Sequence, residues 1–323
     1  MRILMYGAGV QGSLYATRLH EAGHDITLLA RGARLDVLRA EGLVLEEVLT
    51  GRRTLARVRL TASLEPDSVY DLVMVAVRRD QIDDVLPAVA AARRVPTVLF
   101  MHNHAGGSSA LLDAVGAERV VLGFPGAGGV RNDATVRYVL IPQQPTTIGE
   151  PSGRHTPRIH MLVRLLRSAG FRTRVERHMD AWLNVHAVFV TAVVGALYLS
   201  SCNTRTLAAD RHAVRRLVQG VRQGFRALAA NGNGTPPINL RAIFEWVPER
   251  IAVWYWQQYL SHPLAAFAFG GHARAAAVEM AALARDVGML VHGAARQTGT
   301  LDSLWDAIPV LASDSAVVRE GHL

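Results

Sequence analysis

The feature that most constrains the fold is a glycine pattern at the start of the chain. An apolar run, Arg2–Tyr6, leads directly into Gly7-Ala-Gly-Val-Gln-Gly12, and the residues from Gly12 to Ala22 have the pattern of a helix. A G-x-G-x-x-G that follows a strand and opens a helix is typical of a dinucleotide-binding sheet, whereas the same glycines elsewhere carry little information. We therefore expect a Rossmann fold to begin at this first strand.

Each part of this turn has a physical task. Gly7 permits the tight turn, Gly9 lets the backbone approach a pyrophosphate, and Gly12 lets the helix pack closely on the strand. The free N–H groups of the first helical turn would face the anion. The residues that we expect to bind the cofactor here are Gly7, Ala8, Gly9, Val10, Gln11 and Gly12.

The end of the second predicted strand, Asp25–Ala30, bears on which dinucleotide fits. An acidic side chain there would hydrogen-bond the free ribose 2′-hydroxyl of NAD. The chain instead has Arg31 and Arg34 after this strand, with no carboxylate at the expected point. An arginine can pair with a 2′-phosphate and stack on adenine. The sequence therefore predicts NADP(H), bound by Arg31 with support from Arg34; a solvated arginine on a loop is the alternative.

The pattern of apolar runs divides the chain into two domains. Residues 1–172 alternate short apolar runs with helical stretches, as in a parallel sheet with crossover helices, and long helical segments dominate residues 173–323. We expect an α/β Rossmann domain followed by an all-α domain. The further predicted strands are Asp71–Val77, Thr97–His102, Val120–Phe124, Val136–Ile141 and Thr146–Gly149. The long predicted helices are Ala181–Ser200, Ala208–Asn231, Leu240–Leu260 and His272–Val287.

Composition excludes several kinds of function. All 35 basic residues are arginine, so mechanisms that need an amine side chain, such as a Schiff base, are excluded. The net charge of +8 comes from arginines scattered among 27 acidic residues, so we expect an anionic cofactor or substrate and no nucleic-acid partner. No set of Cys, His and Asp has the spacing of a metal site, so we expect no metal.

The sequence also bears on the compartment. A single cysteine, Cys202, cannot form an internal disulfide, which suits a reducing cytoplasm. The apolar stretch Ala187–Leu199 is shorter than the roughly 20 residues that a bilayer span needs, so we expect a buried helix and no membrane. The first apolar run is too short for a secretory leader. We therefore expect a cytoplasmic protein.

With these residues in place, the chain resembles the ketopantoate reductase family. Besides the glycine turn and Arg31, Val75-Ala-Val-Arg78-Arg-Asp-Gln81 is similar to the family's strand end beside the cofactor. Met101-His-Asn103-His104 is similar to its strand that ends in an asparagine contacting substrate and nicotinamide. The resemblance implies a 6-phosphogluconate-dehydrogenase-like arrangement, a homodimer, and reduction of a 2-keto acid by NADPH. It adds to the expected cofactor site Val77, Arg78, Gln81 and Asn103.

The chain departs from this family at the catalytic position. Two residues after Trp182, where the family has the lysine that polarises the ketone and helps deliver a proton, this chain has Asn184. An amide can donate a hydrogen bond but carries no charge, so this loss would cost roughly 3 kcal/mol or more of transition-state stabilisation. Farther along the helix, apolar Val188 and Ala192 replace polar asparagines of the family. The resemblance therefore implies a substrate other than ketopantoate.

A histidine on the same helix is a candidate replacement for the lysine. As a histidine it is of the side-chain type that exchanges protons near physiological pH, so His186 could handle a proton; the alternative is a buried histidine bonded to a carbonyl. His186 and Asn184 are roughly 200° apart around the helix axis, so the two cannot face one cleft equally. The expected catalytic residues are Asn103, Asn184 and His186.

Two further histidines are expected on the substrate side. His104 follows Asn103, and strand alternation would place His102 and His104 on one face with Asn103 on the other, unless the strand has already ended. His272 lies near the position of a family glutamate, and Glu279 lies about two turns later. The expected substrate residues are therefore His104 and His272.

These observations support three hypotheses about function. The first is an NADP(H)-dependent oxidoreductase that acts on a carbonyl or imine compound larger than ketopantoate. The second is an NADP-binding protein without redox turnover, either a non-redox enzyme or a sensor. The third is a helical interaction protein with a vestigial nucleotide site. NADPH consumption separates the first two, and dinucleotide binding separates the third.

Overall fold

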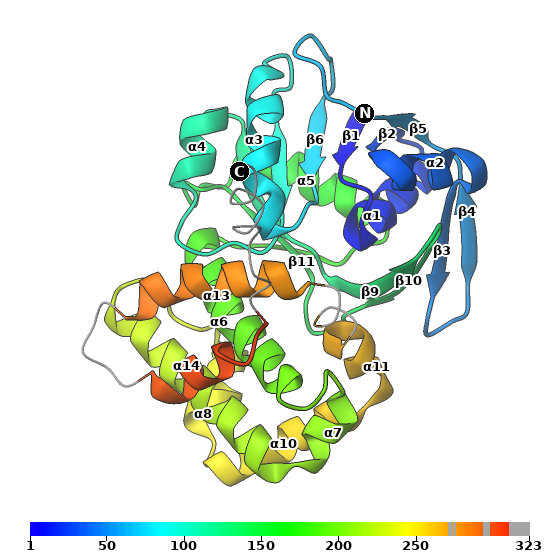
Figure 1. Cartoon of the computed structure of the whole chain (residues 1–323). Helices are drawn as coiled ribbons and strands as arrows, with labels where there is room; N and C mark the ends of the chain where they lie inside the picture. The colour runs from blue at the N-terminus through cyan, green and yellow to red at the C-terminus, as the bar shows by residue number, and fades with distance from the viewer. Residues whose placement is uncertain (271–272, 274–275, 293–297, 310–323) are drawn as a thin grey trace, which may run out of the picture.

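The computed structural model describes residues 1–270, 273, 276–292 and 298–309. An α/β half, built from residues up to Val175, lies above a helical half that begins at Met179 (Figure 1). This confirms the predicted α/β Rossmann domain followed by an all-α domain. The division between residues 172 and 173 stays a prediction, and the short strand just after it still belongs to the sheet.

The main sheet has the order β12-β11-β8-β7-β6-β1-β2-β5. Its first six strands along the chain are parallel, whereas β11 and β12 run in the opposite direction. The chain leaves β1 in one direction to form β2 and later returns to form β6 on the other side, which creates a crevice at the carboxyl ends of β1 and β6. Their bounds are β1 Arg2–Tyr6, β2 Asp25–Leu29, β5 Arg59–Thr61, β6 Leu72–Val75, β7 Val98–Met101, β8 Val120–Phe124, β11 Thr146–Gly149 and β12 Thr173–Val175.

Helices cover both faces of this sheet. On one face, α1 and α5 bury leucines such as Leu14 and Leu162 against the strands. On the other face, α3 and α4 bury Val89 and Leu111. Because both faces are covered, β6 and β7 are continuous apolar runs, as expected for central parallel strands. The helix bounds are α1 Val10–Glu21, α2 Gly32–Glu41, α3 Ile82–Ala91, α4 Ser109–Val115 and α5 Pro157–Ser168.

A second sheet of four strands, in the order β4-β3-β10-β9, packs beside α1. Strand β10 pairs in parallel with β3 and antiparallel with β9, so segments far apart in the chain meet here. Only β10 corresponds to a predicted strand, and its membership of a separate sheet was not predicted. The bounds are β3 Leu43–Glu47, β4 Arg53–Ala56, β9 Ala127–Asn132 and β10 Thr135–Leu140.

The helical half is organised around α6, which passes through its centre (Figure 1). By length and composition α6 could cross a membrane, but 78% of its most apolar window is buried inside the protein. The predicted helix Leu240–Leu260 is wrong as one element, because Pro248 cannot continue the hydrogen-bond ladder and the chain restarts there. The helices are α6 Met179–Tyr198, α7 Thr204–Ala209, α8 Arg211–Ala230, α9 Ile238–Arg241, α10 Glu249–Ser261, α11 Pro263–Ala265, α13 Ala277–Val291 and α14 Gly299–Trp305.

Candidate active site

The glycine turn lies at the end of β1, in the crevice of the sheet. Gly7 has a φ of +110°, which an L side chain rarely adopts, and a Cβ at Gly12 would overlap the carbonyl oxygen of Gly7. Helix α1 begins with Gly9 as its N-cap and has no side-chain cap. Its first N–H groups can therefore bind an anion, and the turn fits the pyrophosphate of a dinucleotide.

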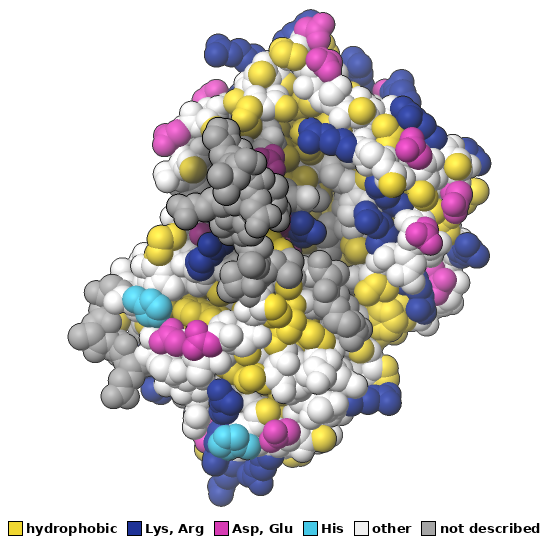
Figure 2. Space-filling view, in the orientation of Figure 1, with side chains coloured by type: hydrophobic (Ala, Val, Ile, Leu, Met, Phe, Trp, Pro, Cys, Tyr) yellow, Lys and Arg dark blue, Asp and Glu magenta, His cyan; other side chains and the backbone are white. Residues whose placement is uncertain are grey.

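Three arginines converge on this turn. Arg34 Nε and Arg131 Nη1 lie 3.1 and 3.3 Å from the carbonyl oxygen of Ala8, and Arg31 Nη2 donates to the Tyr6 hydroxyl at 2.7 Å. Burial, helped by the charge of Arg131, lowers the pKa of Arg34 to about 10. Figure 2 shows arginine side chains around the hollow on this face of the molecule. Two like charges that share one carbonyl favour an anion beside them.

Arg131 was missed by the sequence reasoning. It lies on β9, in the second sheet, and reaches the turn across 123 residues of chain. A single arginine in a basic sequence gives no local signal for this contact. The same strand also fixes the predicted residue Gln11, whose Nε2 donates to the carbonyl oxygen of Ala127 at 2.7 Å.

The predicted segment after β6 forms a single 3-10 turn, Arg79–Gln81. The guanidinium of Arg78 donates to both oxygens of Asp80, at 3.0 and 2.9 Å, and this pairing raises the pKa of Arg78. The Gln81 side chain accepts from the backbone N–H of Arg78, so the two residues hold each other in place. The segment follows β6 at the crevice, where Val77 is half-buried; cofactor contacts from Val77, Arg78 and Gln81 stay a prediction.

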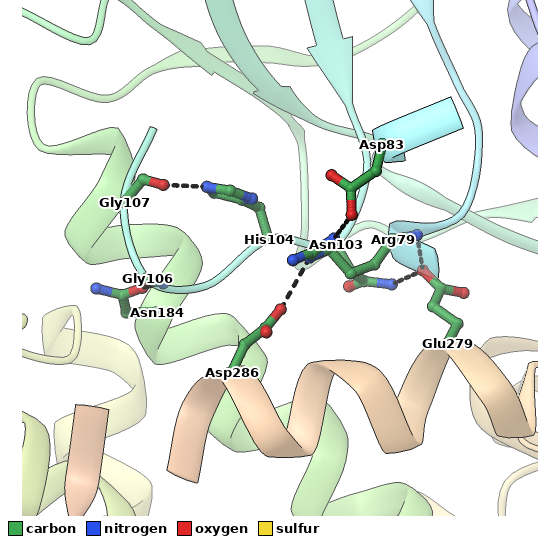
Figure 3. A network of polar contacts seen from close by, with 9 residues as sticks. All are labelled: Arg79, Asp83, Asn103, His104, Gly106, Gly107, Asn184, Glu279 and Asp286. Atoms are coloured by element: carbon green, nitrogen blue, oxygen red, sulfur yellow. Dashed lines mark hydrogen bonds and ion pairs between the residues drawn. The ribbon is translucent and has the colours of Figure 1, made fainter. Parts of the chain in front are cut away.

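At the end of β7, polar side chains connect the two halves of the molecule (Figure 3). Asn103 Nδ2 donates to Glu279 Oε1 at 2.8 Å, and the backbone N–H of Arg79 reaches the same oxygen at 3.5 Å. Arg79 Nε donates to Asp286 at 2.8 Å. Both carboxylates lie on α13, seven residues apart, and therefore on one face of that helix. The sequence placed Glu279 near the site but gave it no role, because its partner is 176 residues away.

His102 and His104 lie on one side of Asn103, with ring centroids 5.5 Å apart. Strand β7 ends at Met101, so the alternation of a strand does not determine which way these side chains point. The prediction allows for a strand that ends before His102. Both nitrogens of His102 and Nδ1 of His104 are buried and have no hydrogen-bond partner among the described residues. Burial lowers the pKa of both histidines, so both are neutral near pH 7.

This burial predicts how stability depends on pH. Because the pKa of folded His102 lies well below the ordinary 6.5, the unfolded chain binds more protons as the pH falls below that value. As the pH falls below 6.5, we expect the free energy of unfolding to fall by up to about 1.4 kcal/mol per pH unit for His102, and over a narrower pH range for His104. Urea unfolding of the wild type and His102→Leu, on both sides of pH 6.5, measures this. If the free energy of unfolding of His102→Leu fell with pH as steeply as that of the wild type, the lowered pKa of His102 would be contradicted. His212→Leu, which replaces an exposed histidine, is the control.

The predicted catalytic residues of α6 point in two directions. Asn184 Oδ1 accepts from the backbone N–H of Gly106 at 3.0 Å, and Nδ2 donates to the carbonyl oxygen of Asn233 at 2.9 Å. His186 stacks on Trp182, with ring centroids 5.4 Å apart, and contacts Phe124. The Asn184 amide therefore connects the loop after β7 to the loop after α8, and His186 lies in an aromatic cluster.

The remaining predicted positions complete the description. His272 lies outside the described residues. Val188 and Ala192 are fully buried in the helical core. The described part of the chain contains no group of three or more His, Cys, Asp or Glu placed to hold a metal ion.

Comparison with known proteins shows which family this chain is similar to. Residues 3–153 match the ketopantoate reductase PanE/ApbA family. A 2-dehydropantoate 2-reductase from Mesorhizobium japonicum is 27% identical over 239 residues, which covers 64% of this chain and 72% of the relative.

Solved structures are similar over nearly the whole chain. The crystal structure of 2-dehydropantoate 2-reductase from Geobacter metallireducens has a TM-score of 0.75 at 18% identity and covers 95% of this chain and 99% of that one. D-mandelate dehydrogenase with NADH and anilino(oxo)acetate has a TM-score of 0.74 at 15% identity, covering 95% and 97%. The sequence matches are to ketopantoate reductases, and the solved structures show that this chain has their fold.

Proposed function

We propose that this protein is an NADP(H)-dependent oxidoreductase that acts on a carbonyl or imine compound larger than ketopantoate. The family and its relatives support an oxidoreductase with a nicotinamide cofactor, and preference for NADP(H) is our own inference. When bound, the reduced cofactor would supply a hydride. The chain's own residues bind the phosphates and position the acceptor.

The observation that carries this proposal is the bonding of the three arginines at the glycine turn. The hydrogen bonds of Arg31, Arg34 and Arg131 go to neutral backbone or hydroxyl oxygens. Their charges are therefore available to the phosphates of a dinucleotide. Arg31 lies two residues after the end of β2, where the 2′-phosphate of NADP would lie, and is the N-cap residue of α2.

Replacing Arg31 by alanine tests the choice of cofactor. Loss of a charge-assisted hydrogen bond to a phosphate costs about 1.5–3 kcal/mol, so we expect NADPH affinity to fall roughly 10- to 100-fold. NADH lacks the 2′-phosphate, and its affinity should change little. Calorimetric titration of both dinucleotides measures the difference, with Arg39→Ala on the exposed face of α2 as the matched control. An equal loss for both dinucleotides would contradict the 2′-phosphate assignment.

On the substrate side we propose roles for the residues around the end of β7. Asn103 contacts the reacting group, and His104 lies beside it. Asn184 shapes the site through the Gly106 loop that it holds, and His186 borders it within the aromatic cluster. NADPH consumption with a panel of ketones, imines and keto acids tests turnover. Tight NADPH binding without turnover on that panel would favour the non-redox alternative. A cytoplasmic location and a homodimer stay predictions.

A further inference from the structure

The hydrogen bond between Asn103 and Glu279 determines which end of the Asn103 amide is available to a substrate. A carboxylate oxygen can only accept, so the Asn103 nitrogen must face Glu279, at 2.8 Å. The other end, Oδ1, is buried and has no hydrogen-bond partner among the described residues. Asn103 itself is 9% exposed and Glu279 is 4% exposed, so water competes little for either group. Asn103 therefore presents its acceptor end, Oδ1, at the end of β7.

The contact with Glu279 also strengthens this acceptor. A carboxylate that accepts from an amide N–H polarises the amide, and the carbonyl oxygen becomes more negative. The low dielectric of the buried site increases the effect. Oδ1 of Asn103 is therefore suited to a donor that carries a positive charge.

Neighbouring groups do not reverse this polarity. Among the described residues, the Arg79 guanidinium is bonded to Asp286, and Arg78, whose charge also acts on Glu279, is bonded to Asp80 (Figure 3 draws Arg79). Burial keeps His102 and His104 neutral near pH 7. The oxygen of Asn184 is used by the backbone N–H of Gly106 and its nitrogen by Asn233. The chain has no lysine that could supply an ammonium group at any position.

We propose that the substrate is a protonated imine whose N–H donates to Asn103 Oδ1 and whose positive charge is stabilised through Asn103 by Glu279. This proposal rests on the proposed oxidoreductase function and specifies its substrate class. In the reduction, the imine carbon gains a hydride and the C=N π pair becomes the lone pair of a neutral amine nitrogen. The two electrons come from oxidation of dihydronicotinamide to its pyridinium form, so no proton donor is needed.

A ketone fits the same groups poorly. Its oxygen only accepts hydrogen bonds and would meet another acceptor at Asn103 Oδ1. As the hydride arrives, the ketone oxygen becomes an alkoxide, whose charge the Glu279 carboxylate would oppose. A protonated imine already carries the charge and the donor that this arrangement stabilises.

Turnover of matched substrates tests the substrate class. We would measure NADPH oxidation by the wild-type protein with 2-methyl-1-pyrroline and 2-phenyl-1-pyrroline, and with cyclopentanone and 2-phenylcyclopentanone as the matched ketones. We expect kcat/KM for the imines to exceed that for the ketones by about 100-fold or more. Turnover of the ketones at an equal or higher rate would overturn the imine proposal and leave the proposed oxidoreductase intact.

Binding of a cation gives a readout that does not depend on turnover. By calorimetry, 2-methylpyrrolidinium should bind the wild-type protein with NADP⁺ present. Glu279→Gln should lower the affinity for this cation about 10- to 100-fold. The amide keeps the size and the hydrogen bond to Asn103 but removes the charge. Cyclopentanone binding should not weaken, and Glu21→Gln, at the far end of α1, should bind like the wild type.

These two measurements separate the possible failures. If no compound on the panel is reduced although NADPH binds, the proposed function fails, and the cation titration still decides the role of Glu279. Pyrrolidinium binding that is unchanged in Glu279→Gln would overturn the proposal. Because Glu279→Gln could unfold the protein, its thermal transition is measured first. Asn103→Ala is the second variant, and it removes the acceptor but leaves the carboxylate. It should also weaken the binding of the cation.

Discussion

Replacing Arg119 by alanine is expected to lower the free energy of unfolding by about 3–5 kcal/mol. Arg119 is 9% exposed, and its guanidinium donates to the backbone carbonyl oxygens at the carboxyl ends of α3 and α4. Its shortest contacts, to the carbonyl oxygens of Ala92 and of Val95 in the loop after α3, are 2.7 and 2.9 Å. The last carbonyls of a helix have no partner within it, and the cation also faces the negative end of the helix dipole.

Urea unfolding of Arg119→Ala measures this loss, and two variants define its cause. Arg119→Lys keeps the charge but not the planar fork that reaches several carbonyls, and we expect it to recover only part of the stability. Exposed Arg94→Ala is the matched control and should change stability by less than about 0.5 kcal/mol. If Arg119→Ala behaved like Arg94→Ala, the carbonyls would have to be satisfied by water instead.

Substitution of the glycines at the start of α1 should separate folding from cofactor binding. A Cβ at Gly12 would overlap the Gly7 carbonyl, so Gly12→Ala must shift α1 against β1, at a cost of roughly 1–3 kcal/mol in stability. The same shift moves the N–H groups that face the pyrophosphate, and we expect dinucleotide binding to fall below detection. Urea unfolding and calorimetric titration of NADPH measure the two effects.

Gly9→Ala is the companion variant. A Cβ at Gly9 meets nothing within 4 Å, and Gly9 has a negative φ of −74°, so alanine fits the free protein. Stability should therefore match the wild type, while the added methyl occupies space that the pyrophosphate needs. Full NADPH affinity in Gly9→Ala would contradict the placement of the pyrophosphate at this turn.

The parts of the fold that depend on local sequence could be predicted. The strand, glycine turn and helix at Arg2–Glu21 are contiguous, and their order alone indicates a Rossmann fold. The second sheet could not be predicted in the same way. Strand β3 is apolar only over Leu43–Leu45 before two glutamates, and β9 begins Ala-Gly-Gly, so neither has an apolar pattern along its whole length. They are strands because they pair with β10, and that pairing depends on long-range contacts.

The candidate site shows the same division. Residues within the motifs, such as Gly7 and Asn103, could be identified from spacing and resemblance. Arg131 and Glu279 could not be given roles, since each reaches the site from another sheet or domain. For Asn184, the sequence suggested a role that its contacts in the structure do not show directly. Its position in the sequence suggested a catalytic amide, but its amide bonds to the backbone of two loops can be seen only in three dimensions.

The second sheet contacts both the glycine turn and the helical domain. Through Arg131 and the Gln11–Ala127 hydrogen bond it contacts the glycine turn, and through Arg137, whose guanidinium lies 5.5 Å from the centroid of the Phe267 ring, it contacts the helical domain. A shift of this sheet on dinucleotide binding would therefore reach the helical domain directly. Thermodynamic reciprocity then requires the two effects to be equal. A compound bound by the helical domain would change the affinity for the dinucleotide by the same factor as the dinucleotide changes the affinity for that compound.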